Sequence, residues 1–168
     1  MQPTFVLRAG DRGVTLLREV MMNISDALMS DVWKRVGAKR SEQILAMQKR
    51  HQKEQKTLTK FAYKHLLELP EDAAGVGIYA FHVILEAFFA LRPLPKAVRR
   101  PAIDHAWKLP AEVLAEKVHA VEPHAAQYLT DALMDEEEVV LVESERALCS
   151  QVVQTAILSL HGACGNSR

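Results

Sequence analysis

The chain has 168 residues, of which 49% are hydrophobic and 25% charged, and its 21 basic and 21 acidic residues cancel to a formal net charge of zero. This average composition favours one soluble domain and excludes collagen-like, fully disordered and disulfide-scaffold proteins. Two cysteines, Cys149 and Cys164, provide no disulfide framework and fit a reducing compartment. Residues 1–10 show no signal-peptide pattern, so we expect a cytoplasmic protein.

Hydrophobic spacing indicates helices along nearly the whole chain, and we therefore expect an all-α or mainly α single domain. Val14–Leu28 carries apolar residues three and four positions apart, which predicts an amphipathic helix that stops near Gly37. Only Thr4–Arg8 and Val139–Val142 resemble strands. We expect no sheet larger than a two- or three-stranded wing.

The stretch from Ser41 to Leu69 contains no helix breaker before Pro70 and predicts one long helix. At 100° per residue, several of its lysines fall within about 80° of one another and form a basic stripe. These residues are Lys49, Lys53, Lys56, Lys60 and Lys64. Gln48–Thr57 includes no apolar side chain, so we expect it to form solvent-exposed helix.

Lysines spaced along a helix suit contacts with phosphates, which provide affinity without reading base sequence. A second basic cluster follows within residues 96–108. The sequence therefore favours a non-enzymatic nucleic-acid-binding protein, acting on DNA or RNA as a subunit of a larger nucleoprotein assembly. The residues expected to contact phosphates are Lys49, Arg50, Lys53, Lys56, Lys60, Lys64, Arg99 and Arg100.

The charges are unevenly distributed along the chain. Residues 1–65 hold 13 basic and 6 acidic residues, a net charge of +7, whereas residues 111–145 hold 1 basic and 10 acidic residues, a net charge of −9. The alternative hypothesis is therefore a protein–protein interaction adaptor, whose opposed basic and acidic faces bind partner subunits or further copies of the chain.

Ala73–Leu91 is apolar enough to raise the question of a membrane span, but Glu86 at mid-span would be costly in lipid. We therefore expect a buried core helix and no membrane contact. Gly75 and Gly77 near its start suggest a close backbone approach. His82 and Glu86 lie four positions apart and share a face, so they could form a catalytic or metal constellation or a satisfied structural pair.

The segment Pro110–Ser144 resembles a winged helix-turn-helix, with a helix on each side of a short turn and Val139–Val142 as the first wing strand. The resemblance implies buried positions at Leu114, Ala115, Val118, Val121, Ala126, Leu129 and Leu133. The exposed face of the second helix would show Glu122, Pro123, His124, Gln127, Tyr128 and Asp131. That face contains no Arg or Lys, so we do not expect it to read DNA. A possible subdivision is a helical bundle over residues 1–108 and the winged-helix-like segment plus a C-terminal helix over residues 109–168.

The aromatic residues stand at or beside the apolar positions of the expected helices. Trp33, Trp107 and Tyr79 are therefore predicted to belong to the core rather than to stack on bases, as are Tyr63, Phe81, Phe88 and Phe89.

Signals for an enzyme are sparse. Glu116 and His119 match a single Glu-x-x-His, which di-iron bundles use twice. His161 and Cys164 have a ligand-like spacing but lack the second half of a zinc site. The chain contains no phosphate loop, Ser-His-Asp order or dinucleotide fingerprint. We therefore predict no enzymatic activity, no metal and no cofactor.

Overall fold

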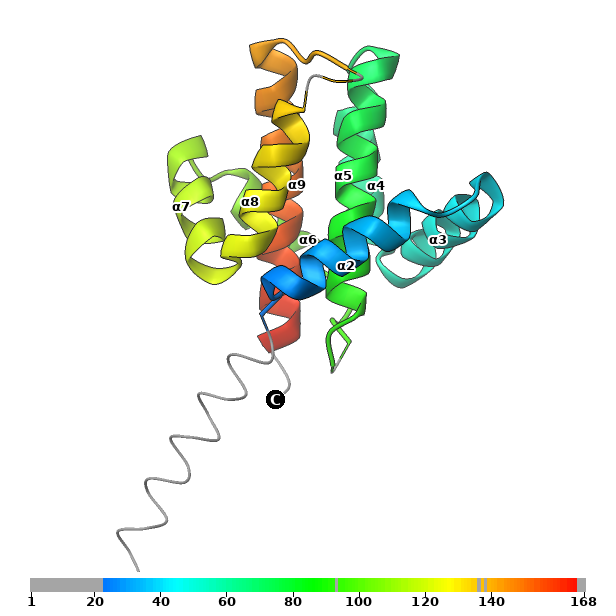
Figure 1. Ribbon diagram of the computed structural model, residues 1–168. Coiled ribbons are helices and arrows are strands. Elements are labelled where there is room, and N and C mark those ends of the chain that lie inside the picture. Colours follow the sequence, from blue (N-terminus) through cyan, green and yellow to red (C-terminus); the bar gives the residue numbers. More distant parts are fainter. Residues whose placement is uncertain (1–22, 93, 136, 138, 166–168) are drawn as a thin grey trace, which may run out of the picture.

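The computed structural model describes residues 23–165 except 93, 136 and 138, and Figure 1 shows this part of the chain as a set of packed helices. The described residues form eight helices and no strand, which confirms the all-α expectation. The helices are α2 (Asp26–Gly37), α3 (Ser41–Glu54), α4 (Lys56–Leu66), α5 (Glu71–Phe89), α6 (Arg100–Trp107), α7 (Ala111–Val121), α8 (Pro123–Met134) and α9 (Glu143–Gly165).

Helices α5 and α9 run side by side at the centre of the molecule (Figure 1), and α4, α6, α7 and α8 all pack against α9. Residues 81–88 of α5 are buried without exception. Both α5 and α9 are long and apolar enough to cross a membrane by length and composition. In this structure the other helices cover much of both, and the expectation of a core helix over α5 is confirmed.

The start of α2 differs from the sequence-based prediction. Ser25 caps the helix, since its Oγ accepts a hydrogen bond from the Leu28 N–H at 3.0 Å, and the helix begins only at Asp26. The helix predicted over Val14–Leu28 is therefore wrong at residues 23–25. Residues 14–22, like the possible strand Thr4–Arg8, lie outside the described residues.

The single helix predicted from Ser41 to Leu69 is wrong, because it breaks at Gln55, between α3 and α4. The Gln55 side chain is buried and clamps a distant segment. Its Nε2 donates to the Lys96 carbonyl oxygen at 2.9 Å, and its Oε1 accepts from the Val98 N–H at 2.9 Å. The two helices therefore point in different directions, and α3 projects to one side of the molecule (Figure 1).

Exposure along Gln48–Thr57 agrees with the prediction only in part. Lys49, Lys53 and Lys56 are exposed as expected, but His51 and Gln55 are buried. Both side chains form hydrogen bonds inside the protein, and these bonds offset the cost of burying a polar group.

The two helices of the winged-helix-like segment occur as α7 and α8, but the wing does not. Within the predicted core, Leu114, Val118, Leu129 and Leu133 are buried, while Ala115, Val121 and Ala126 are partly exposed. Val139–Val142 is not a strand. Glu122, expected on the exposed face, is the one-residue connection between α7 and α8 and is fully buried.

Two further expectations concern a close backbone approach at Gly75 and Gly77 and the burial of the aromatic residues. A Cβ at Gly77 would lie 2.8 Å from a Leu66 methyl carbon and 2.9 Å from the Cys149 sulfur, whereas a Cβ at Gly75 would meet nothing within 4 Å. The close approach is therefore confirmed for Gly77 and wrong for Gly75. Of the aromatic residues predicted to belong to the core, Phe81 and Phe88 are buried. Those partly covered are Tyr63, Phe89 and Trp107. The prediction fails for Trp33 and Tyr79, which are 52% and 38% exposed.

Candidate polyanion-binding face

All eight residues predicted to contact phosphates are exposed, but the break at Gln55 divides them. Lys49, Arg50 and Lys53 belong to α3. Lys56, Lys60 and Lys64 belong to α4, while Arg99 and Arg100 stand at the start of α6. The lysine stripe is therefore not one straight row, as a continuous helix would have made it.

On α4 the three lysines share the outer face. They recur every four residues, so their side chains lie within about 80° of one another. The opposite side of the helix buries Leu58 and Phe61 among others. Burial of that side fixes the rotation of α4 and keeps the lysines in solvent.

Two sets of contacts bring the second basic cluster next to α4. The Gln55 clamp holds residues 96–98 at the α3–α4 junction. Further along, the Trp107 ring of α6 packs on Phe61 and His65 of α4, with ring centroids 5.2 Å and 4.4 Å apart. We call the resulting surface the α4–α6 basic face, and it consists of Lys56, Lys60, Lys64, Arg99 and Arg100.

The titration of His65 reflects this arrangement. Burial is the largest cause that lowers the pKa of His65, and the charges of Lys64 and Arg100 lower it further against the opposing effect of Glu68. Two members of the face, one from each cluster, therefore act on the same imidazole. Arg100 also pairs with Asp104 at 2.9 Å, but this exposed pair is screened by solvent and contributes little to stability.

Beneath the flanking helix α3 lies a buried chain of hydrogen bonds that joins α3, α4 and α5. His51 Nε2 lies 2.7 Å from Glu86 Oε1, and His51 Nδ1 lies 2.7 Å from His82 Nδ1. The Tyr63 hydroxyl oxygen lies 2.5 Å from His82 Nε2. Arg50 completes the chain with an ion pair to Glu86. We call these five residues the histidine chain.

The partners determine which nitrogens carry protons. Glu86 can only accept as a carboxylate, so His51 holds its proton on Nε2. His51 Nδ1 is then the acceptor, and His82 donates to it from Nδ1. His82 Nε2 is left as an acceptor for the Tyr63 hydroxyl. Every group in the chain is satisfied with both imidazoles neutral.

Burial controls the titration of this chain. Burial, followed by the neighbouring His51, lowers the pKa of His82 to about 3. Burial alone would raise the pKa of Glu86, but the hydrogen bond from His51 and the Arg50 charge lower it to about 2. Burial also lowers the pKa of His51, against the opposing effect of Glu86. The chain is therefore held in one protonation state near neutral pH.

This arrangement does not supply an activated nucleophile. Burial raises the pKa of Tyr63, so its hydroxyl keeps its proton. Transfer of that proton along the chain would end on the Glu86 carboxylate. This carboxylate is a far weaker base than the Tyr63 phenolate that would be left behind. The pair His82–Glu86 thus belongs to a satisfied structural network that docks α3 on α5.

A second buried carboxylate lies at the α7–α8 connection. Glu122 Oε2 accepts from the Ile24 N–H at 3.0 Å, and Glu122 Oε1 lies 2.9 Å from His161 Nδ1. These partners, 98 and 39 residues away, explain why Glu122 turns inward. Burial raises the pKa of Cys164 to about 11, and the charge of Glu122 adds to that effect.

The predicted metal-like pairs do not gather into sites. Glu116 and His119 are exposed on α7. Across the part of the chain that the structure describes, no group of three or more His, Cys, Asp or Glu residues could hold a metal ion. Comparisons with protein-family models, curated proteins and solved structures found no match to this chain.

Sequence reasoning recognised His82 and Glu86 as a pair because they share one helix face. It missed His51, Tyr63 and Arg50, which join them from α3 and α4. His51 stands in a run of polar residues, where an exposed side chain is the natural expectation.

Proposed function

We propose that this protein binds the phosphate groups of nucleic acid through the α4–α6 basic face, with α3 as a flank, and that it does so without catalysis. The observation that carries the proposal is the Gln55 clamp, since it joins two basic clusters that lie about 40 residues apart in the sequence. The lysines on the outer face of α4 and the arginines at the start of the neighbouring α6 together offer several cations for contacts with phosphates.

The composition of the face favours binding without base reading. Three of the five cations are lysines, flexible point charges that lack the planar fork with which arginine recognises guanine. Of the two arginines on the face, Arg100 already pairs with Asp104. Among the described residues, the exposed aromatic side chains Trp33 and Tyr79 belong to α2 and α5 and not to this face. Stacking on single-stranded bases is therefore not expected there.

The α7–α8 pair does not support a second, reading surface. His124 lies 4.0 Å from Asp26, and Asp131 accepts a hydrogen bond from Gln127. These acids would repel phosphates near the start and middle of α8. The pair serves better as a packing element against α9.

The proposal is tested by fluorescence anisotropy with a generic DNA duplex and a generic RNA duplex at two salt concentrations. Lys56→Glu, Lys60→Glu and Lys64→Glu are combined in one variant. Its affinity should fall by at least about tenfold, and the salt slope of log affinity should fall by roughly two to three units.

The matched control carries the same change of net charge elsewhere, through Lys34→Glu, Lys39→Glu and Lys117→Glu on α2, after α2 and on α7. It should bind nearly as the wild type does. Equal loss in both variants would show that net charge alone drives binding, and absence of salt-dependent binding by the wild type would refute the proposal.

A second candidate, the self-associating adaptor, is favoured by one observation. The pocket bordered by α2, α5 and α8 is lined by four carboxylates, whereas α4 and α6 lie behind α5 and α9 in Figure 1. Opposite charges on different sides of the molecule permit head-to-tail pairing of copies. Sedimentation at low and high salt tests this candidate, which requires a larger species at low salt.

A further inference from the structure

Helix α3 is attached to the rest of the protein less firmly than the helix that follows it. It buries Met47 and His51 out of 14 residues, whereas α4 buries five side chains out of 11. Non-helical residues 38–40 precede α3, and the helix ends at non-helical Gln55. Figure 1 shows α3 projecting to one side of the molecule. It is therefore a short, thinly packed helix between two breaks.

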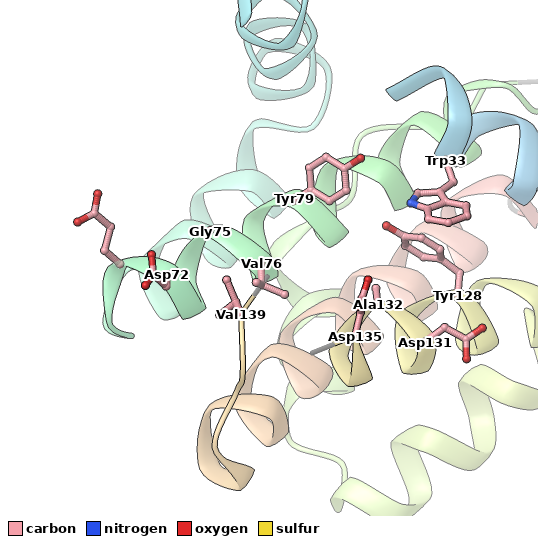
Figure 2. Close-up of a pocket in the computed structure, with 11 residues that line it drawn as sticks. Trp33, Asp72, Gly75, Val76, Tyr79, Tyr128, Asp131, Ala132, Asp135 and Val139 are labelled. Carbon is pink, nitrogen blue, oxygen red and sulfur yellow. The ribbon is translucent and has the colours of Figure 1, made fainter. Parts of the chain in front are cut away.

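The helices on either side of α3 are held in place without it. Helix α2 packs on α5 and α8, where Trp33 of α2 lines one pocket together with Tyr79 and Tyr128 (Figure 2). Helix α4 packs on α5, α6 and α9, and the Gln55 clamp fixes its start to residues 96–98. We call α2 and α4–α9 the body. The contacts of α2 and α4 within the body do not depend on α3.

The polar attachment of α3 to the body is the histidine chain. Among the described residues, the charged and titratable groups that face the imidazoles of His51 and His82 are Arg50 from α3, Tyr63 from α4 and Glu86 from α5. Burial raises the pKa of Tyr63. Burial would also raise the pKa of Glu86, but the hydrogen bond from His51 and the Arg50 charge lower it to about 2. Between pH 7 and pH 5, the imidazoles are therefore the groups of this chain that can change charge.

The docked arrangement has no place for an additional proton on these imidazoles. An added proton either sets two N–H donors against each other across the 2.7 Å between His51 Nδ1 and His82 Nδ1, or it occupies His82 Nε2. In the second case the Tyr63 hydroxyl loses the acceptor that lies 2.5 Å away. Both cases also bury a further charge, which is costly. When α3 leaves α5, water can solvate that charge at His51.

We propose that α3 is a pH-sensitive latch, which opens from the body as a separate unit when mild acid protonates His51 and His82. Opening of a thinly packed element, separate from global unfolding, is a common property of proteins. Histidine suits such a switch because its ordinary titration falls just below neutral pH. The opening moves Lys49 and Lys53 away from the α4–α6 basic face. The latch itself requires no nucleic acid, so it does not rest on the proposed function.

The size of the response follows from proton uptake by the open form. Burial lowers the pKa of His51 in the docked state, against the opposing effect of Glu86. An exposed histidine has a pKa of about 6.5, so below that pH the open form binds protons that the docked form does not. For one histidine that stays neutral when docked, the ratio of open to docked molecules rises about twentyfold from pH 7 to pH 5. His82 adds to this response where the loss of His51 exposes it.

Amide hydrogen exchange of the wild type, measured by mass spectrometry without nucleic acid, tests the latch. Each rate is divided by that of a fully exposed amide at the same pH, which removes the direct effect of pH on exchange. A helix as short as α3 is barely stable alone in water, so its amides report the opening. At pH 7, amides of residues 45–54 should open at least about tenfold more often than those in the middle of α9. Their opening should increase by about twentyfold or more at pH 5.

Two double variants assign the response to the histidine chain. His51→Gln with His82→Gln keeps donors and acceptors in the same order without an imidazole, so opening of α3 should change less than about threefold between pH 7 and pH 5. The matched control, His105→Gln with His119→Gln, replaces exposed histidines of α6 and α7 and should respond as the wild type does.

Three results would each overturn the latch. The first is wild-type α3 that opens no more often than α9, since the opening would then be global. The second is an increase below about threefold between pH 7 and pH 5 in the wild type. The third is a full response in the variant without the two imidazoles. If α3 of that variant is already open at pH 7, His51→Gln alone takes its place, and an undiminished response there overturns the latch equally.

Discussion

The histidine chain makes the stability of the protein depend on pH in a specific window. In the folded state His82 is buried and its pKa is about 3, whereas an exposed histidine in the unfolded chain has a pKa near 6.5. Below pH 6.5, His82 therefore binds a proton in the unfolded state but stays neutral in the folded state. Stability is complete above that value and falls as the pH decreases toward 3.

The size of the effect follows from the pKa difference. Between pH 7 and pH 5, the proton taken up by the unfolded state at the His82 position costs the fold about 2 kcal/mol. The lowered pKa of His51 acts with the same sign. Glu86 also loses stability in acid, because its pKa is lowered from 4.5 to about 2, but that loss occurs mainly below pH 4.5. The window from pH 7 to pH 5 therefore isolates the histidines.

The assay is urea unfolding of the wild type and of His82→Gln at both pH values. The amide can still accept from Tyr63 and donate to His51, so the variant should fold with lower stability at pH 7. Its loss of stability between pH 7 and pH 5 should be about 2 kcal/mol smaller than that of the wild type, at an unchanged m value. The control His119→Gln, exposed on α7, should lose as much as the wild type. Equal losses in the wild type and His82→Gln would refute the reasoning.

Further substitutions test the packing, each by urea unfolding at pH 7. Gly77→Ala should lower the free energy of unfolding by about 1–3 kcal/mol, because the new methyl group would overlap two buried side chains. Gly75→Ala on the same helix should raise it by up to about 1 kcal/mol. A rise in both variants would contradict the close approach at Gly77. Gln55→Ala should cost about 1–3 kcal/mol and increase amide exchange around Val98, which loses its acceptor; unchanged exchange there would count against the clamp. Glu122→Leu should cost about 3–5 kcal/mol, because two donors lose a buried acceptor, and a loss below about 1 kcal/mol would contradict that role.

The sequence predicted helices well wherever the pattern is local. Pro110 precedes α7 directly, and Pro123 occupies the first position of α8, as expected of proline at helix starts. The apolar run within α5 correctly indicated the core helix. Periodicity and capping depend on neighbours within about one helical turn, so the sequence alone contains that information.

Features set by distant partners could not be predicted in this way. The break at Gln55 depends on an amide that bonds to backbone groups 41 and 43 residues away. His51 is buried because His82, 31 residues away, donates a hydrogen bond to it and Glu86, 35 residues away, accepts one from it. Glu122 was expected on an exposed face for the same reason. A polar side chain in a polar run is predicted to be exposed unless its partner is known.

The way in which α3 is attached bears on the proposed function. Its buried side chains are Met47 and His51, so apolar contact holds this helix only weakly. Hydrogen bonds between charged and buried groups are directional, whereas apolar contacts permit sliding. We infer that the histidine chain fixes the rotation of α3 and, with it, the positions of Lys49 and Lys53 beside the α4–α6 basic face. A buried polar network can therefore fix the orientation of a helix even where it adds little net stability.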